Sequence, residues 1–271
     1  LYFGGTDIMG HLAFIESILN TNHITELGAQ YRYFPGYHIF IAIGSEITGL
    51  HIKDAMFVFV GLAWQAGLLF AYLIFHRFSN SSRIALIACL VFSVNEAAIY
   101  YGSYSVARTL DFVLFLGWFY IALNLFKKDV MYIPLLLIIT AALILTHHLT
   151  TILLTPVLVV FYICQKIFFG FRKEHPLLPL APLIFLSVTF FGYFIWVSSE
   201  LFGSVLPAYM ASIFTTEMEL AVDPGQLAGS PLAYVFNSAY YALVLIFALF
   251  GISFAWNAGR EKTIRNTLRT L

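Results

Sequence analysis

The sequence predicts an all-α fold, a polytopic bundle of transmembrane helices with amphipathic helices in an outer loop. Of its 271 residues, 61% are hydrophobic and only 10% are charged, whereas a soluble domain carries about 25% charged residues. Its apolar residues also form runs near the roughly 20 residues with which a helix crosses a bilayer. Backbone groups in lipid must be hydrogen-bonded internally, which favours helices over isolated strands.

Seven apolar runs with few internal charges are the candidate spans. They cover 55–76, 84–101, 106–126, 130–146, 149–168, 177–198 and 231–257. We therefore expect one integral membrane domain, with an outer loop at 1–54 and a multi-pass bundle at 55–271 that carries a further outer loop at 199–230. Because the chain starts at Leu1 and its opening is not a signal peptide, we also expect a fragment or a processed product.

The positive charges of the short connections predict the orientation. Lys and Arg crowd the connections after the first, third, fifth and seventh runs, which places those connections in the cytoplasm. The loop 199–230, with four acidic residues and no Lys or Arg, falls on the outer side. We therefore expect an integral protein of the cell membrane whose active side faces outward.

Residues 33–50 are apolar, but in this topology they begin and end on the outer side. We expect a short re-entrant or surface-lying helix that starts at Pro35-Gly36, because proline suits the first turn of a helix. A genuine membrane crossing is the alternative.

Ionisable side chains are costly at membrane depth and are functional candidates by default. Asp7 follows two glycines where an amphipathic helix begins, and His11 comes one helical turn later. Residues at this spacing share a helix face, so the pair could share a proton or a ligand. The alternative is that Asp7 only caps the helix.

Two outward turns carry the other candidates. The first holds Tyr104, Arg108 and Asp111, which a tyrosine belt and a structural ion pair would also explain. The second holds His147 and His148, which lie about 100° apart on a helix and so do not suit one shared metal ion. They suit hydrogen bonding to a phosphate, with a plain polar turn as the alternative.

Several function classes find no support in the sequence. The formal net charge is zero, so nucleic acid is not an expected partner. The two cysteines lie in apolar runs and indicate no disulfide framework. No phosphate-binding Gly-rich loop, HExxH or CxxC motif occurs.

Taken together, four segments resemble the GT-C superfamily of membrane glycosyltransferases, and most nearly the protein O-mannosyltransferases and aminoarabinose transferases that use polyprenyl-phosphate sugars. The segments are Gly5-Thr6-Asp7 with His11, the stretch YRYFPGYHIFIAIGSEITGL, Tyr101-Gly-Ser-Tyr with Asp111 beyond it, and Thr146-His147-His148.

The resemblance implies a role for each candidate residue. Asp7 would be the catalytic base of an inverting transfer, and Asp111 would orient Arg108 or the acceptor. Tyr33–His38 would be the proline-containing segment that helps to seat the phosphate of the lipid carrier, with Arg32 or His38 as its basic residue. The substrate-binding residues would be His11, Arg32, His38, Tyr104, Arg108, His147 and His148. The donor would be a polyprenyl-phosphate-linked sugar, and the acceptor a protein, a lipid or a glycan. No cofactor and no metal ligand are implied, although a divalent metal ion is left open.

Two other function classes stay open from the sequence. A transporter or flippase of a lipid-linked substrate would have polar groups and broken helices near the bilayer midplane, where Gln65, Asn95 and Glu96 are the only hints. A non-catalytic scaffold subunit could use the acidic loop 199–230 to dock a partner.

Overall fold

The computed structural model describes residues 6–24, 31–103, 105–125, 131–169, 178–200 and 203. Every regular element in this part of the chain is an α-helix, apart from a 3₁₀ residue at Leu125, which confirms the all-α prediction there. The chain divides into two units, Leu1–Leu206 and Pro207–Leu271, and all the described residues belong to the first. The predicted span 231–257 and most of the loop 199–230 lie outside the described residues.

Two helices occupy the predicted outer loop. Helix α1 is Thr6–Thr21 and helix α2 is Gly36–Thr48, which begins directly after its N-cap residue Pro35, as predicted. Helix α2 ends at Gly49, whose φ of 68° lies in the left-handed region that glycine adopts without steric cost. Whether α2 lies on the membrane surface or enters the lipid stays a prediction.

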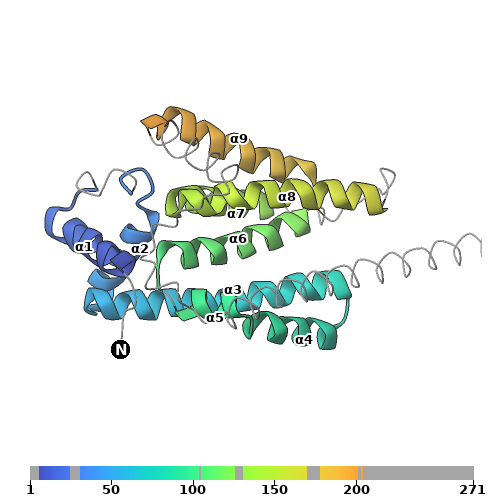
Figure 1. The fold of residues 1–271 in the computed structure, drawn as a ribbon, viewed down its shortest axis with the longest axis horizontal. Helices are drawn as coiled ribbons and strands as arrows, with labels where there is room; N and C mark the ends of the chain where they lie inside the picture. Colours follow the sequence, from blue (N-terminus) through green and yellow to red (C-terminus); the bar gives the residue numbers. More distant parts are fainter. Residues whose placement is uncertain are drawn as a thin grey trace, which may run out of the picture. The chain divides into compact units, whose positions relative to one another are not determined.

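Five of the predicted spans each contain one helix. These helices are α3 (Ile52–Ser79), α6 (Ala107–Asn124), α7 (Tyr132–Thr146), α8 (His148–Phe169) and α9 (Leu180–Trp196), drawn in Figure 1. Within the described residues, α3 is long and apolar enough to cross a membrane. Shorter apolar helices of 10–17 residues lie at Ser82–Ser93, Tyr132–Thr146 and Leu180–Trp196, and a stretch of the same kind lies within α8 at Leu154–Lys166.

The single helix predicted over 84–101 is in fact two helices, α4 (Ser82–Ser93) and α5 (Glu96–Ser103). Val94, with φ −91° and ψ 0°, leaves the helical conformation between them. The hydroxyl of Ser93 donates to the carbonyl of Leu90, and the amide of Asn95 donates to the carbonyl of Phe92. These local bonds satisfy the end of α4, and apolar composition alone did not reveal the break.

Close helix packing in the first unit depends on glycines. A methyl group added at Gly67 of α3 would lie 2.9 Å from the side chain of Val113 in α6, and one at Gly117 of α6 would lie 2.9 Å from that of Ile139 in α7. Small residues let helix backbones approach closely. Helix α6 therefore packs against both α3 and α7.

Candidate functional site

One apolar cluster joins the outer-loop helices to the bundle. It contains Ile8 of α1, Tyr37 and Ile41 of α2, and Leu110 of α6, all buried, together with residues from the first turns of α3. Ile8 follows Asp7 in the chain, and Leu110 precedes Asp111. The backbones of the two predicted catalytic carboxylates thus flank the same cluster, although the side chain of Asp7 lies outside what the structure describes.

The start of α2 adjoins two other predicted segments. A methyl group added at Gly36 would lie 2.9 Å from the carbonyl oxygen of Leu145 and 3.2 Å from the amide nitrogen of Thr146, so α2 begins directly against the last turn of α7. The hydroxyl of Tyr37 donates to the carbonyl oxygen of Ser105 at 2.6 Å, just before α6. The start of α6 and the end of α7, two segments predicted to lie at outward turns, therefore both adjoin α2 at residues 36 and 37.

His11 and His38 form a buried hydrogen-bonded pair. Nδ1 of His11 lies 2.8 Å from Nε2 of His38, and the two side chains are 2% and 0% exposed. The rings of Phe14, Tyr31 and Tyr37 surround the pair, mostly in edge-on arrangements. Helical spacing pairs His11 with Asp7 on one face of α1, and the structure adds a tertiary partner for His11 from α2.

Burial sets the charge of His38. It lowers the pKa of His38 to about 3, and the nearby His11 acts in the same direction. Nδ1 of His38 is buried with no hydrogen-bond partner among the described residues. A neutral imidazole can exchange hydrogen bonds, but it brings no positive charge to an anion.

Three more of the predicted residues lie on or next to α6 and α7. Asp111 is fully buried in α6, whereas Arg108, in the first turn of the same helix, is exposed. His147 is 5% exposed and has an extended backbone between α7 and α8. Tyr104 and the side chain of His148 lie outside the described residues.

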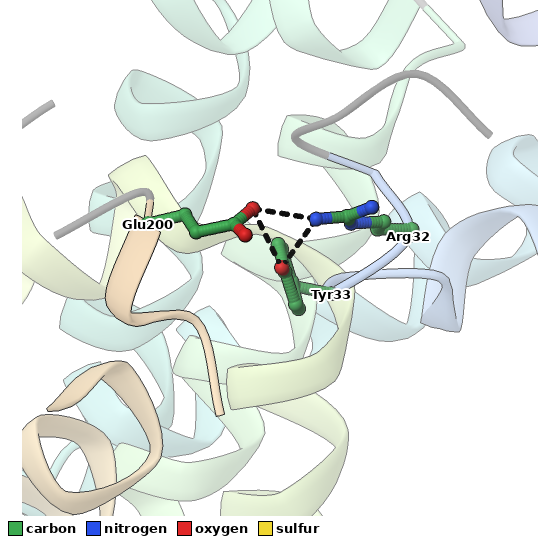
Figure 2. Close-up of polar contacts among 3 residues, drawn as sticks. All are labelled: Arg32, Tyr33 and Glu200. Carbon is green, nitrogen blue, oxygen red and sulfur yellow. Dashed lines mark hydrogen bonds and ion pairs between the residues drawn. The ribbon is translucent and has the colours of Figure 1, made fainter. Parts of the chain in front are cut away.

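The predicted phosphate ligand Arg32 is held by an acidic residue from beyond α9. Figure 2 shows the three side chains of this group, Arg32, Tyr33 and Glu200. Nη2 of Arg32 lies 2.6 Å from Oε2 of Glu200 and 2.6 Å from the hydroxyl of Tyr33. That hydroxyl also donates to the same carboxylate oxygen at 3.0 Å. One carboxylate oxygen therefore accepts from two donors.

The base of this group is apolar and buried. Phe34 is fully buried against Phe190 and Phe194 of α9 and Ile144 of α7. The hydroxyl of Tyr193 in α9 donates to the backbone carbonyl of Tyr33. The segment before α2 is therefore fixed by its buried contacts with α7 and α9, while its ionic contact with Glu200 is open to solvent.

Sequence reasoning missed Glu200 as a partner of Arg32. It assigned Glu200 only to an acidic loop, and it treated Tyr33 as part of a proline-containing segment. A usable signal was present, because an acidic loop without Lys or Arg, predicted to lie on the same side as Arg32, favours a complementary ion pair.

No group of three or more His, Cys, Asp or Glu side chains that could hold a metal ion occurs among the described residues. No protein-family model, curated protein or solved structure matches the chain. The chemistry must therefore be argued from the residues themselves.

Proposed function

We propose that the chain is a multi-pass membrane glycosyltransferase that moves a sugar from a polyprenyl-phosphate donor to an acceptor on the non-cytoplasmic side. The observation that carries the proposal is the meeting of four distant segments. Residues 33–38 contact the end of α7 and the segment just before α6, and they share one apolar cluster with the first turns of α1 and α6. These segments hold most of the residues that the resemblance to GT-C enzymes implies.

The surface supports several membrane crossings. Large aliphatic side chains on α4, α7, α8 and α9 are more than half exposed, among them Ile87, Val91, Ile138, Val160 and Val188. Soluble monomers rarely expose contiguous apolar surface on this scale. Glycines at helix contacts are also typical of helix packing in lipid. Lipid is therefore the solvent that suits these outer faces.

The proposed reaction needs one base and a stabilised leaving group. Asp7 takes the proton of the acceptor hydroxyl while the acceptor oxygen bonds to the anomeric carbon and the bond from that carbon to the phosphate oxygen breaks. The phosphate leaves as a weak base and needs no dedicated general acid. Attack opposite the leaving group inverts the anomeric centre.

The surroundings suit this chemistry. The buried Asp111 and His147 border a region of low dielectric, where hydrogen bonds to a departing phosphate are stronger than in water. Arg32 and Arg108, which are less buried, supply positive charge in this proposal. Protein, lipid and glycan acceptors all present a hydroxyl for such a site.

The test is sugar transfer by the full-length protein in lipid vesicles, with polyprenyl-phosphate-linked sugars as donors. Asp7→Asn should lower the rate by about 10²–10⁴-fold, the usual contribution of a general base. Glu16→Gln is the matched control, because Glu16 is an exposed acid on the same helix. Full turnover by Asp7→Asn would reject Asp7 as the base.

A lipid-carrier transporter is the second candidate, favoured by the helix break at Val94 and Asn95. Broken helices bordered by polar residues are typical of transporter binding sites. Vesicles loaded with a fluorescent polyprenyl phosphate separate the two classes. Movement of the probe between leaflets without any sugar transfer would favour the transporter.

A further inference from the structure

The contact drawn in Figure 2 has the geometry of an occupied anion site. A guanidinium nitrogen of Arg32 and the hydroxyl of Tyr33 both bond to Oε2 of Glu200, at 2.6 and 3.0 Å. The guanidinium also lies over the ring of Tyr33, with 4.7 Å between its central carbon and the ring centroid. Arginine forms the same charge-assisted bonds with phosphate oxygens as with carboxylates.

The acceptor of this site, the carboxylate of Glu200, can be displaced, whereas one of its donors, Tyr33, is held in place. The side chain of Glu200 is 72% exposed and that of Arg32 is 39% exposed, so solvent screens their attraction. Tyr33 is anchored through its backbone by Tyr193, and its neighbour Phe34 is fully buried. Glu200 can therefore leave while Tyr33 stays in place.

We infer that Glu200 is a built-in competitor of the phosphate ligand, occupying the Arg32–Tyr33 site until a phosphate group displaces its carboxylate. The inference rests on the proposed function, because it adds a competitor for phosphate at the same phosphate-binding segment. While Glu200 occupies the site, its ion pair joins the segment before α2 to the residues after α9. Binding of phosphate replaces that ionic contact and leaves the apolar contact of Phe34 intact.

The competition predicts a definite effect of neutralising Glu200. Exposed ion pairs of this kind contribute little, so removing the competing charge should tighten phosphate binding by about 1.5- to 5-fold. Glu200→Gln keeps the shape of the side chain and loses the charge. Glu200→Asp keeps the charge on a shorter stem that reaches Arg32 less well, so it should give a smaller gain.

The experiment measures binding to the full-length protein in lipid nanodiscs, with a polyprenyl phosphate in one arm and inorganic phosphate in the other. Glu46→Gln is the matched control, because Glu46 is an exposed acid on α2. We expect Glu200→Gln to tighten binding and Glu46→Gln to leave it unchanged. In the background of Arg32→Gln, the substitution of Glu200 should no longer tighten binding.

The two arms also identify the source of the phosphate. Tightening in the lipid arm alone identifies a carrier head group, and tightening in both arms identifies a site for free phosphate as well. Equal or weaker binding by both Glu200 variants would overturn the inference, and so would tightening that persists without Arg32. Sugar transfer measured in the same samples tests the proposed function separately. If sugar is transferred but phosphate binding does not respond to Glu200, only the inference about Glu200 fails.

Discussion

Lowering the pH from about 7.5 to about 5 should loosen the contact between α1 and α2, because the buried His38 cannot take up a proton there. Its pKa is about 3 in the folded protein, against an ordinary value of 6.5. When α1 separates from α2, His38 becomes exposed and can be protonated, whereas it stays neutral while the two helices are packed together. Stability is therefore fully present above about pH 6.5 and is lost as the pH falls toward 3.

The size of the effect follows from this difference in pKa. At about pH 5, the opened state gains about 2 kcal/mol from protonation of His38, whereas the gain at about pH 7.5 is near zero. An opening equilibrium shifted by that amount is about 30-fold more populated. The rings of His11, Tyr31 and Tyr37 surround the imidazole, and none of these three side chains is a carboxylate that would stabilise its charged form.

Amide hydrogen exchange of the detergent-solubilised protein measures this opening directly. After correction for the intrinsic effect of pH on exchange, peptides from α1 and α2 should exchange about 30-fold faster at about pH 5, while peptides from α7 should not change. His38→Gln should remove most of this dependence, because its amide does not titrate. His23→Gln, at an exposed position, is the control. Protection of α1 and α2 that ignores pH, or an unchanged response in His38→Gln, would refute the reasoning.

Three substitutions test other contacts through the thermal stability of the purified protein. Gly36→Ala should destabilise by about 1–3 kcal/mol through overpacking against α7, whereas Gly61→Ala, with open space at its Cβ position, should be neutral or slightly stabilising; equal effects would contradict the packing. Tyr37→Phe should cost about 1–3 kcal/mol, because it leaves the buried carbonyl of Ser105 without its hydroxyl donor. Gln165→Leu should cost about 2–4 kcal/mol, since the side-chain amide of Gln165 makes two hydrogen bonds to the backbone of Leu178, before α9. A melting temperature equal to that of the wild type would show that these bonds contribute nothing.

Helix positions could be predicted from the sequence because they depend on local composition and caps. The apolar runs at 55–76 and 106–126 each contain one helix, and Pro35 marks the start of α2. Although Asn95 and Glu96 hinted at it, the break at Val94 was not predicted, because the run 84–101 is apolar enough overall for one unbroken span. It depends on hydrogen bonds that Ser93 and Asn95 make to the preceding turn.

The candidate site was predicted as a set of residue types, but its pairings were not. His11 and Asp7 share a periodicity that the sequence displays, whereas the bond from His11 to His38 depends on how α1 packs on α2. In the same way, Arg32 was singled out for its charge, and its partner Glu200 lies far along the chain. Such pairings are set by tertiary contacts, for which one sequence gives no spacing rule.

The contact of Gly36 with Leu145 also constrains how the protein is made. A ribosome finishes α2 long before it reaches α7, so the start of α2 waits without its partner while α3 to α6 are synthesised. A nascent chain interrupted in that interval cannot complete the junction at residue 36.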